Sequence, residues 1–412
     1  MIQSFVGLFA FILMAALLSE NRKKISGRLI VTAVGLQLVF GFFLLKFKLV
    51  REGFLVLNKL VLTLDKATGD GTSMVFGYLG GGPLPFNESF PGASFILAFK
   101  SLPLVLVMSA LSALLFYWKV IPLVVRLFSM ILNKTMNTGG AEGIGISANI
   151  FVGMVEAPLL IKPYLGSMTR SELFTLMTCG MATIAGTVMV LYASILNSVI
   201  PGILGHILTA SIISAPAAIL ISKIMIPETS DITAGEFSKE NQYKSSMDAV
   251  TKGTIQGIEL LINIIAMIIV LVALVSLTNM ALGLLPWFHG QVLTLQRMMG
   301  WVMSPVSWLM GIPWAESVTT GSLMGTKTVL NEFIAYLDLS KIPVTDLSDR
   351  SRIIISYAMC GFANPGSLGI MIGGMGAMVP ERRDEIVSIG LRSIISGTLA
   401  TCMTGAIAGI FL

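Results

Sequence analysis

The chain has 412 residues, of which 55% are hydrophobic and 12% are charged, and its formal net charge is +5. Its mean hydropathy is +0.86. Because a soluble domain carries about 25% charged residues, this composition excludes a soluble fold and a disordered chain. The small and dispersed positive charge argues against nucleic-acid binding. The composition is typical of a polytopic helical membrane protein.

Uncharged apolar runs of about 20 residues mark membrane crossings. Basic residues follow the first run and do not precede it, so it is predicted to be a mature span rather than a secretory signal. The positive-inside rule places the loop at 22–28 in the cytoplasm. The sequence predicts eight crossings, at 2–18, 29–45, 101–118, two within 173–222, 260–288, 353–380 and 393–412.

Four other stretches do not fit a simple crossing. Residues 46–70 mix apolar and charged side chains, as in a helix that lies in the membrane interface, and residues 223–252 form a polar linker. The stretches 142–162 and 316–338 are apolar but contain carboxylates and lysines. Each is long enough for two half-helices, so both are predicted to be re-entrant hairpins. Backbone of that kind is tolerated in a membrane only where it is buried in protein or lines a cavity.

The two predicted hairpins are followed by similar sequences. Glu156 precedes CGMATIAG at 179–186, and Glu332 precedes CGFANPGS at 360–367. Both sequences contain helix breakers, after Thr183 in the first and after Asn364 in the second. This pattern indicates a secondary transporter with inverted repeats, in which substrate and coupling ion bind at broken helices. The ends of such helices offer free amide donors and carbonyl acceptors.

A glutamate inside a membrane costs about 2.5–3.5 kcal/mol on insertion scales. Glu156 and Glu332 are therefore expected to face a cavity or a partner. The functional interpretation places both at the transport site. The structural alternative pairs Glu156 with Lys162 and Glu332 with Lys327, and the sequence leaves the roles of Lys327 and Glu142 open.

The remaining chemical motifs are few. Cys179, Cys360 and Cys402 all lie in apolar stretches and are predicted to be packing residues. No Walker motif, HExxH or GxSxG occurs in the sequence, so ATP-driven pumping and metalloproteolysis lose support.

Three motifs resemble those of the concentrative nucleoside transporters: SANIFVGMVEAPL at 147–159, GSLMGTKTVLNEFIAY at 321–336 and CGFANPGS at 360–367. The resemblance extends over essentially the whole chain. It implies an all-α polytopic membrane protein with eight transmembrane helices, two re-entrant helical hairpins and inverted repeats. It also implies a homotrimer in the plasma membrane of a bacterium. The implied function is transport rather than catalysis.

The same resemblance divides the chain into scaffold and transport parts. These are 1–118 (scaffold helices and interfacial helix), 119–222 (first transport repeat), 223–253 (polar linker), 254–297 (scaffold helix and interfacial segment) and 298–412 (second transport repeat).

The resemblance also implies a substrate site. A carboxylate accepts hydroxyl protons, whereas an amide both donates and accepts. Such a site penalises analogues that lack the hydroxyls. The residues that would hold the ribose are Asn331, Glu332, Asn364 and Ser367, with Val188 and Phe362 as walls.

A sodium site maps onto four residues. The side chains of Asn149 and Thr183 would bind the ion together with the carbonyls of Val152 and Ile184. Threonine replaces the serine that is more usual in the family at position 183. The set suits one ion for each nucleoside. A tenfold sodium gradient (about 1.4 kcal/mol) and a potential of ~100 mV (about 2.3 kcal/mol) would then support roughly 500-fold accumulation. Proton coupling through Glu156 or Glu332 is the alternative.

The corner that would bind the base departs from the family pattern. Many members have Gly-Gln-Thr-Glu or Gly-Gln-Ser-Glu there, whereas this chain has Gly153, Met154, Val155 and Glu156. Met and Val cannot hydrogen-bond a pyrimidine edge, but methionine offers an adaptable surface for a larger ring. Purine-preferring members resemble this chain in having Met after the glycine. We therefore expect selectivity for purine nucleosides, with Glu156 at a ring N–H, and broad specificity is the alternative.

Two rival functions belong to other classes. A membrane nucleosidase would use Glu156 and Glu332 as acid and base. A passive channel would need no coupling ion, but the carboxylates and the repeat favour alternating access.

Overall fold

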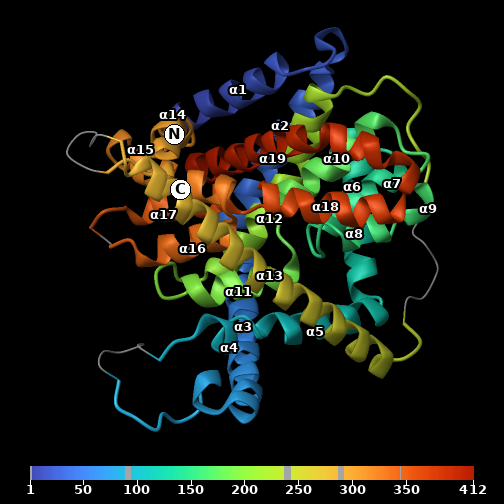
Figure 1. The fold of residues 1–412 in the computed structure, drawn as a ribbon. Coiled ribbons are helices and arrows are strands. Elements are labelled where there is room, and N and C mark those ends of the chain that lie inside the picture. The colour runs from blue at the N-terminus through green and yellow to red at the C-terminus, as the bar shows by residue number, and fades with distance from the viewer. Residues whose placement is uncertain (1, 89–93, 236–242, 286–291, 344) are drawn as a thin grey trace.

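The computed structural model describes residues 2–88, 94–235, 243–285, 292–343 and 345–412. Within these ranges the chain folds into helices and contains no strand (Figure 1). Among the described residues, six helical units are long and apolar enough to cross a membrane, and α1 is a shorter apolar helix. The elements that match the predicted crossings are α1 (Ile2–Leu17), α2 (Gly27–Lys46), α5 (Leu104–Tyr117), α10 (Arg170–Ala182) with α11 (Gly186–Leu196), α12 (Ile203–Met225), α13 (Ser246–Leu282), α17 (Asp349–Met359) with α18 (Pro365–Met378), and α19 (Arg383–Phe411).

The predicted helix breaks are confirmed. The helix α10 ends at Ala182 and α11 begins at Gly186, whereas α17 ends at Met359 and α18 begins at Pro365. A further interruption follows α11, at Pro201 and Gly202, where Gly202 has a φ of +72°. That conformation is easily adopted only by glycine.

Both predicted hairpins are formed by consecutive helices that pack against each other. The first is α7 (Gly140–Asn149) followed by the short helices α8 (Glu156–Leu159) and α9 (Lys162–Leu165). The second is α15 (Trp314–Val329) followed by α16 (Glu332–Lys341). The remaining helices are α3 (Lys48–Phe76), α4 (Leu97–Lys100), α6 (Val120–Met136) and α14 (Leu295–Leu309). The segment predicted to lie in the interface is therefore one helix, α3, which extends past Asp70.

The helix α19 is the centre of the packing. It contacts α12, α10, α17 and α1, and it lies among them in Figure 1. Hydroxyl pairs join these helices: Thr178 to Ser396 at 2.7 Å and Ser214 to Thr404 at 2.9 Å. Small and hydroxyl-bearing residues at helix contacts are typical of membrane bundles, because lipid supplies no hydrophobic drive for helices to associate.

The helix α13 has a different environment. It packs mainly against α5 and is otherwise largely exposed, and the two helices extend away from the body in Figure 1. Gly253 and Gly257 allow this approach, since a Cβ at Gly253 would lie 2.8 Å from the backbone of Ala110. The side of α13 that does not pack against α5 therefore has few contacts with other helices.

The predicted linker is shorter than 223–253, because helices occupy both of its ends. Lys223 lies in the last turn of α12, where it pairs with the buried Glu142 at 2.9 Å and with Glu228 at 3.2 Å. Burial raises the pKa of Glu228, but the charge of Lys223 and a hydrogen bond from Thr169 outweigh it and hold that pKa below its ordinary value. Glu142 is thus a structural residue that fastens the first hairpin to α12. Residues 236–242 lie outside the described part of the chain.

The contact between α14 and α15 depends on the absence of a side chain at Gly321. A Cβ there would lie 2.5 Å from the carbonyl oxygen of Gly300 and 2.9 Å from the amide nitrogen of Ser304. We expect Gly321→Ala to destabilise the protein by about 1–3 kcal/mol, seen as a lower unfolding temperature in detergent. Gly373→Ala is the control, because a Cβ there meets nothing within 4 Å. Equal unfolding temperatures for the two variants would contradict the close contact.

Candidate functional site

A pocket of about 890 Å³, counting its open mouth, lies where the two hairpin tips meet the two helix breaks and α13. It is lined by every residue that the sequence predicted to contact substrate: Gly153, Met154, Val155, Glu156, Val188, Asn331, Glu332, Phe362, Asn364 and Ser367.

Four helices begin at the pocket wall: α8, α11, α16 and α18. The first turns of a helix present unpaired backbone N–H groups and the positive end of the helix dipole. The two hairpin glutamates are the first residues of α8 and α16, which places their carboxylates at such ends. The two repeats inferred from the sequence therefore correspond in the structure: in each, one helix starts at the hairpin glutamate and another starts after the helix break.

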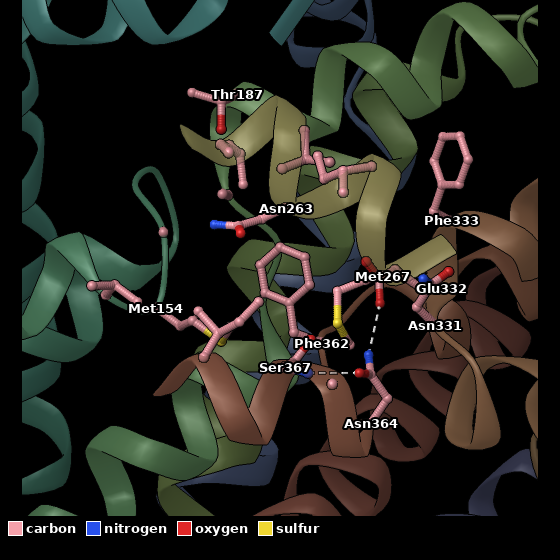
Figure 2. Close-up of a pocket in the computed structure, with 18 of the residues that line it drawn as sticks. Met154, Thr187, Asn263, Met267, Asn331, Glu332, Phe333, Phe362, Asn364 and Ser367 are labelled. Atoms are coloured by element: carbon pink, nitrogen blue, oxygen red, sulfur yellow. Dashed lines mark hydrogen bonds between the residues drawn. The ribbon is translucent and has the colours of Figure 1, made fainter. Parts of the chain in front are cut away.

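Glu332 is held in place by two buried partners. The Tyr192 hydroxyl donates to its Oε1 at 2.6 Å, and the Asn364 amide donates to its Oε2 at 3.1 Å (Figure 2). The Glu332 side chain is 4% exposed. Because an ionised carboxylate has about four acceptor positions, these two partners leave room for a donor on a bound molecule.

The orientation of Asn364 is fixed by its position before α18. Its Oδ1 accepts a hydrogen bond from the Ser367 amide at 2.8 Å, so its Nδ2 points at Glu332 (Figure 2). Asn331 caps α16 in the same manner, through the amide of Ile334 at 2.9 Å. The two asparagines therefore begin their helices and present polar groups to the pocket at the same time.

The tip of the first hairpin forms a different surface. Met154 is buried, and Val155 packs where a Cβ on Gly374 would come within 2.9 Å of it. The Glu156 side chain is exposed to the pocket. A Cβ at Gly153 would meet the Glu156 carboxylate, so a larger residue there would displace that side chain. This corner combines an apolar surface with one carboxylate.

Neither alternative ion pair occurs in the described part of the chain. Lys327 is fully buried, but its Nζ donates to the Ala358 carbonyl at 2.9 Å and to the Thr401 hydroxyl at 3.0 Å. Among the described residues, Glu156 forms no ion pair within 4 Å, with Lys162 or any other cation. Lys327 thus joins the second hairpin to α17 and α19, and both glutamates keep acceptor positions for other groups.

The residues predicted to bind sodium come together behind the first hairpin tip. The Thr183 hydroxyl lies 3.0 Å from the Asn149 carbonyl, and the Gly186 amide donates to the Phe151 carbonyl at 3.1 Å. Val152 and Ile184 lie in the non-helical segments beside them. Both amide atoms of Asn149 are buried without a hydrogen-bond partner in the described ranges. Buried amide atoms usually have hydrogen-bond partners, so Asn149 stands out from the other amides of the site.

Several lining residues were not predicted from the sequence. Tyr192 lies within an uncharged run whose sequence indicates a membrane span but no binding role. Asn263 is the one amide in the apolar run 260–277 of α13, and because polar residues within spans are commonly functional, its position in that run was a usable signal. The others are Ala185, Thr187, Leu260, Ile264, Met267, Leu271, Phe333, Gly366 and Ile370.

The fold and site are those of a secondary membrane transporter: paired hairpins and broken helices surround a polar pocket within a helical bundle. Family models described as the N-terminus and C-terminus of Na+ dependent nucleoside transporters match residues 6–79 and 206–409, and one described as nucleoside recognition matches 98–199. The chain belongs to this family of concentrative nucleoside transporters, and it is a transporter rather than an enzyme.

Individual proteins show the same similarity. The nucleoside permease NupC of Helicobacter pylori is 34% identical over 99% of this chain and 97% of its own length. Solute carrier family 28 member 3 of Homo sapiens is 36% identical over 99% of this chain, which spans 59% of that longer protein. A structure of CNTnw in an inward-facing substrate-bound state is 34% identical, with a TM-score of 0.89 over 100% of this chain and 97% of that chain.

The Tyr192 hydroxyl should matter to nucleoside binding although it was not predicted. We expect Tyr192→Phe to weaken nucleoside affinity about tenfold, because one oxygen of the buried Glu332 loses its donor. Calorimetric titration of the purified protein measures this change. Tyr78→Phe is the control, since Tyr78 is 43% exposed and does not line the pocket. An unchanged affinity in Tyr192→Phe would show that the hydrogen bond does not prepare Glu332 for ligand.

Proposed function

We propose that the protein imports purine nucleosides by sodium-driven symport through alternating access. The observation that carries this proposal is the chemical polarity of the pocket. A doubly held carboxylate with free acceptor positions, Glu332, lies at one end, and the apolar surface of Met154 and Val155 lies at the other. A nucleoside has the same polarity, with a hydroxyl-rich sugar and a flat ring.

The ribose is proposed to bind at the Glu332 end. The free acceptor positions of the carboxylate suit vicinal hydroxyls, and Asn331, Asn364 and Ser367 surround it with further donors and acceptors. The partners of Glu332 are set before ligand arrives, so little ordering is required on binding.

The base is proposed to lie against the first hairpin tip, between Met154 and Phe362. Methionine adapts its shape and favours contact with aromatic rings. Glu156 is then available for a ring N–H of a purine. A pyrimidine would leave its polar edge against Met154 and Val155, which costs about 1–3 kcal/mol for each buried group left unpaired.

Sodium coupling is supported by the chemistry around Asn149. An amide oxygen, a threonine hydroxyl and carbonyls at helix breaks form a hard-oxygen set of the kind that binds Na+ in transporters. The Asn149 amide is buried and has no hydrogen-bond partner in the described structure, so its oxygen is available to coordinate an ion. Protonation of Glu156 is the alternative coupling reaction, since that carboxylate opens to the pocket without a cation beside it.

The assembly is proposed to be a homotrimer in the plasma membrane of a bacterium. The match to the bacterial permease NupC along almost the whole chain supports this location.

Introducing Gln and Thr at the tip of the first hairpin should strengthen pyrimidine binding. We expect Met154→Gln with Val155→Thr to raise uridine affinity about five- to thirtyfold, because the new side chains can pair with the uracil edge. Competition of unlabelled uridine against labelled inosine measures this change. Inosine binding by the variant is the folding control. Equal uridine and inosine affinities in the unmodified protein would defeat the selective version of the proposal.

The ion site is tested by labelled inosine uptake into proteoliposomes with an inward sodium gradient and no pH gradient. We expect accumulation above equilibrium in the unmodified protein and its loss in Asn149→Ala, whereas Asn21→Ala, at an exposed loop position, accumulates normally. Uptake that requires a proton gradient instead would refute sodium coupling and transfer the role to the glutamates. Equilibration without accumulation would indicate a passive channel.

A further inference from the structure

The helix α13 presents one polar side chain to the pocket. The residues that it contributes to the wall are Leu260, Asn263, Ile264, Met267 and Leu271. Their spacing places them on a single face of the helix, and Asn263 is the only member of this face with hydrogen-bonding atoms. Its amide has no protein partner among the described residues and its side chain is exposed to the pocket.

The position of Asn263 along α13 places it beside the base rather than the ribose. Met267 and Leu271 approach the start of α18, because a Cβ on Gly366 would lie 2.9 Å and 3.8 Å from their terminal carbons. Leu260 lies at the opposite end, where it also lines a neighbouring cavity with Glu156 and Gly153. Asn263 lies between these levels, one helical turn (about 6 Å) beyond Met267.

Figure 2 shows the same separation. Thr187 and Asn263 lie on the side of the pocket away from Asn364 and Ser367. The Thr187 hydroxyl, in the first turn of α11, also has no hydrogen-bond partner in the described ranges. At this end of the pocket the first hairpin has Met154 and Val155 where many family members have Gln and Thr. An amide and a hydroxyl are supplied there by other helices instead, on Asn263 and Thr187.

We propose that Asn263 is a specificity-determining residue that hydrogen-bonds the C6–N7 edge of a bound purine. This inference rests on the proposed purine selectivity. In that proposal Glu156 takes the ring N–H of hypoxanthine or guanine, whereas adenine has an unprotonated nitrogen at that position; in all three bases C6 and N7 form the other polar edge. A carboxamide matches an adenine there with two hydrogen bonds, through the exocyclic amino group and N7. It matches hypoxanthine or guanine with one, since O6 and N7 are both acceptors.

The decisive variant is Asn263→Leu, which keeps the size of the side chain and removes both amide atoms. We expect at least a fivefold loss of adenosine affinity and a smaller loss for inosine. In the unmodified protein, 7-deazaadenosine should bind at least fivefold more weakly than adenosine, and in Asn263→Leu this difference should vanish. Binding of 3′-deoxyadenosine should be weakened by the same factor in both proteins, because that change lies at the ribose end.

Met267→Leu is the matched control, one turn along the same face of α13. It should shift adenosine and 7-deazaadenosine together. If 7-deazaadenosine binds the unmodified protein as tightly as adenosine, the inference is wrong whatever the variants do. If Asn263→Leu keeps the full discrimination, another group contacts that edge. A preference of the unmodified protein for uridine over adenosine would instead overturn the proposed function itself, so the two failures are distinguishable.

Discussion

The buried carboxylate of Glu332 is the constraint on which the rest of the site depends. A charge at that depth costs several kcal/mol unless it is paired or hydrogen-bonded. No cation forms a direct ion pair with it in the described structure; two neutral donors, Tyr192 and Asn364, and the start of α16 contact it, while the charge of Lys327 acts on it from a longer distance. Neutral donors leave acceptor positions open, whereas a lysine partner would have competed with a ligand for them. Lys327, the nearest candidate in sequence, donates to Ala358 and Thr401.

Broken helices follow from the same constraint. Backbone donors can face a ligand within a membrane only where a helix begins, because inside a helix they are paired. The chain therefore starts four helices around one pocket. Asparagine is suited to two of these starts, since Asn331 and Asn364 cap their own helices with one amide atom and keep the other for the pocket. The residues that end the regular structure and those that form the site are the same residues.

These coupled roles explain which features were predictable. Hairpins, breaks and glutamates leave local signals, because a carboxylate or Pro-Gly within an apolar run is rare for a physical reason. Tyr192 leaves none, since its importance comes from a fold that brings α11 to α16, far apart in sequence. Lys223 was assigned to the linker from its charge alone, but its pairing with Glu142 from another helix keeps it within α12. Asn263 is recognisable in the sequence as an amide within an apolar run, but only the structure shows that it lines the pocket.

The two ends of the pocket differ in how firmly they are built, and this difference suits a transporter. The Glu332 end is fixed by hydrogen bonds, whereas the first hairpin tip relies on a short second arm, an adaptable methionine and a glutamate without a cation beside it. The ion residues of the proposed mechanism lie behind this less fixed end, where the Gly186 amide bonds to the Phe151 carbonyl and so joins the start of α11 to the hairpin loop. An ion bound at Asn149 would order the backbone that carries both Met154 and Val188. In the proposed mechanism the ribose would bind to a prepared surface, and the surface for the base would be completed only when the ion is present, which is the thermodynamic requirement for coupling.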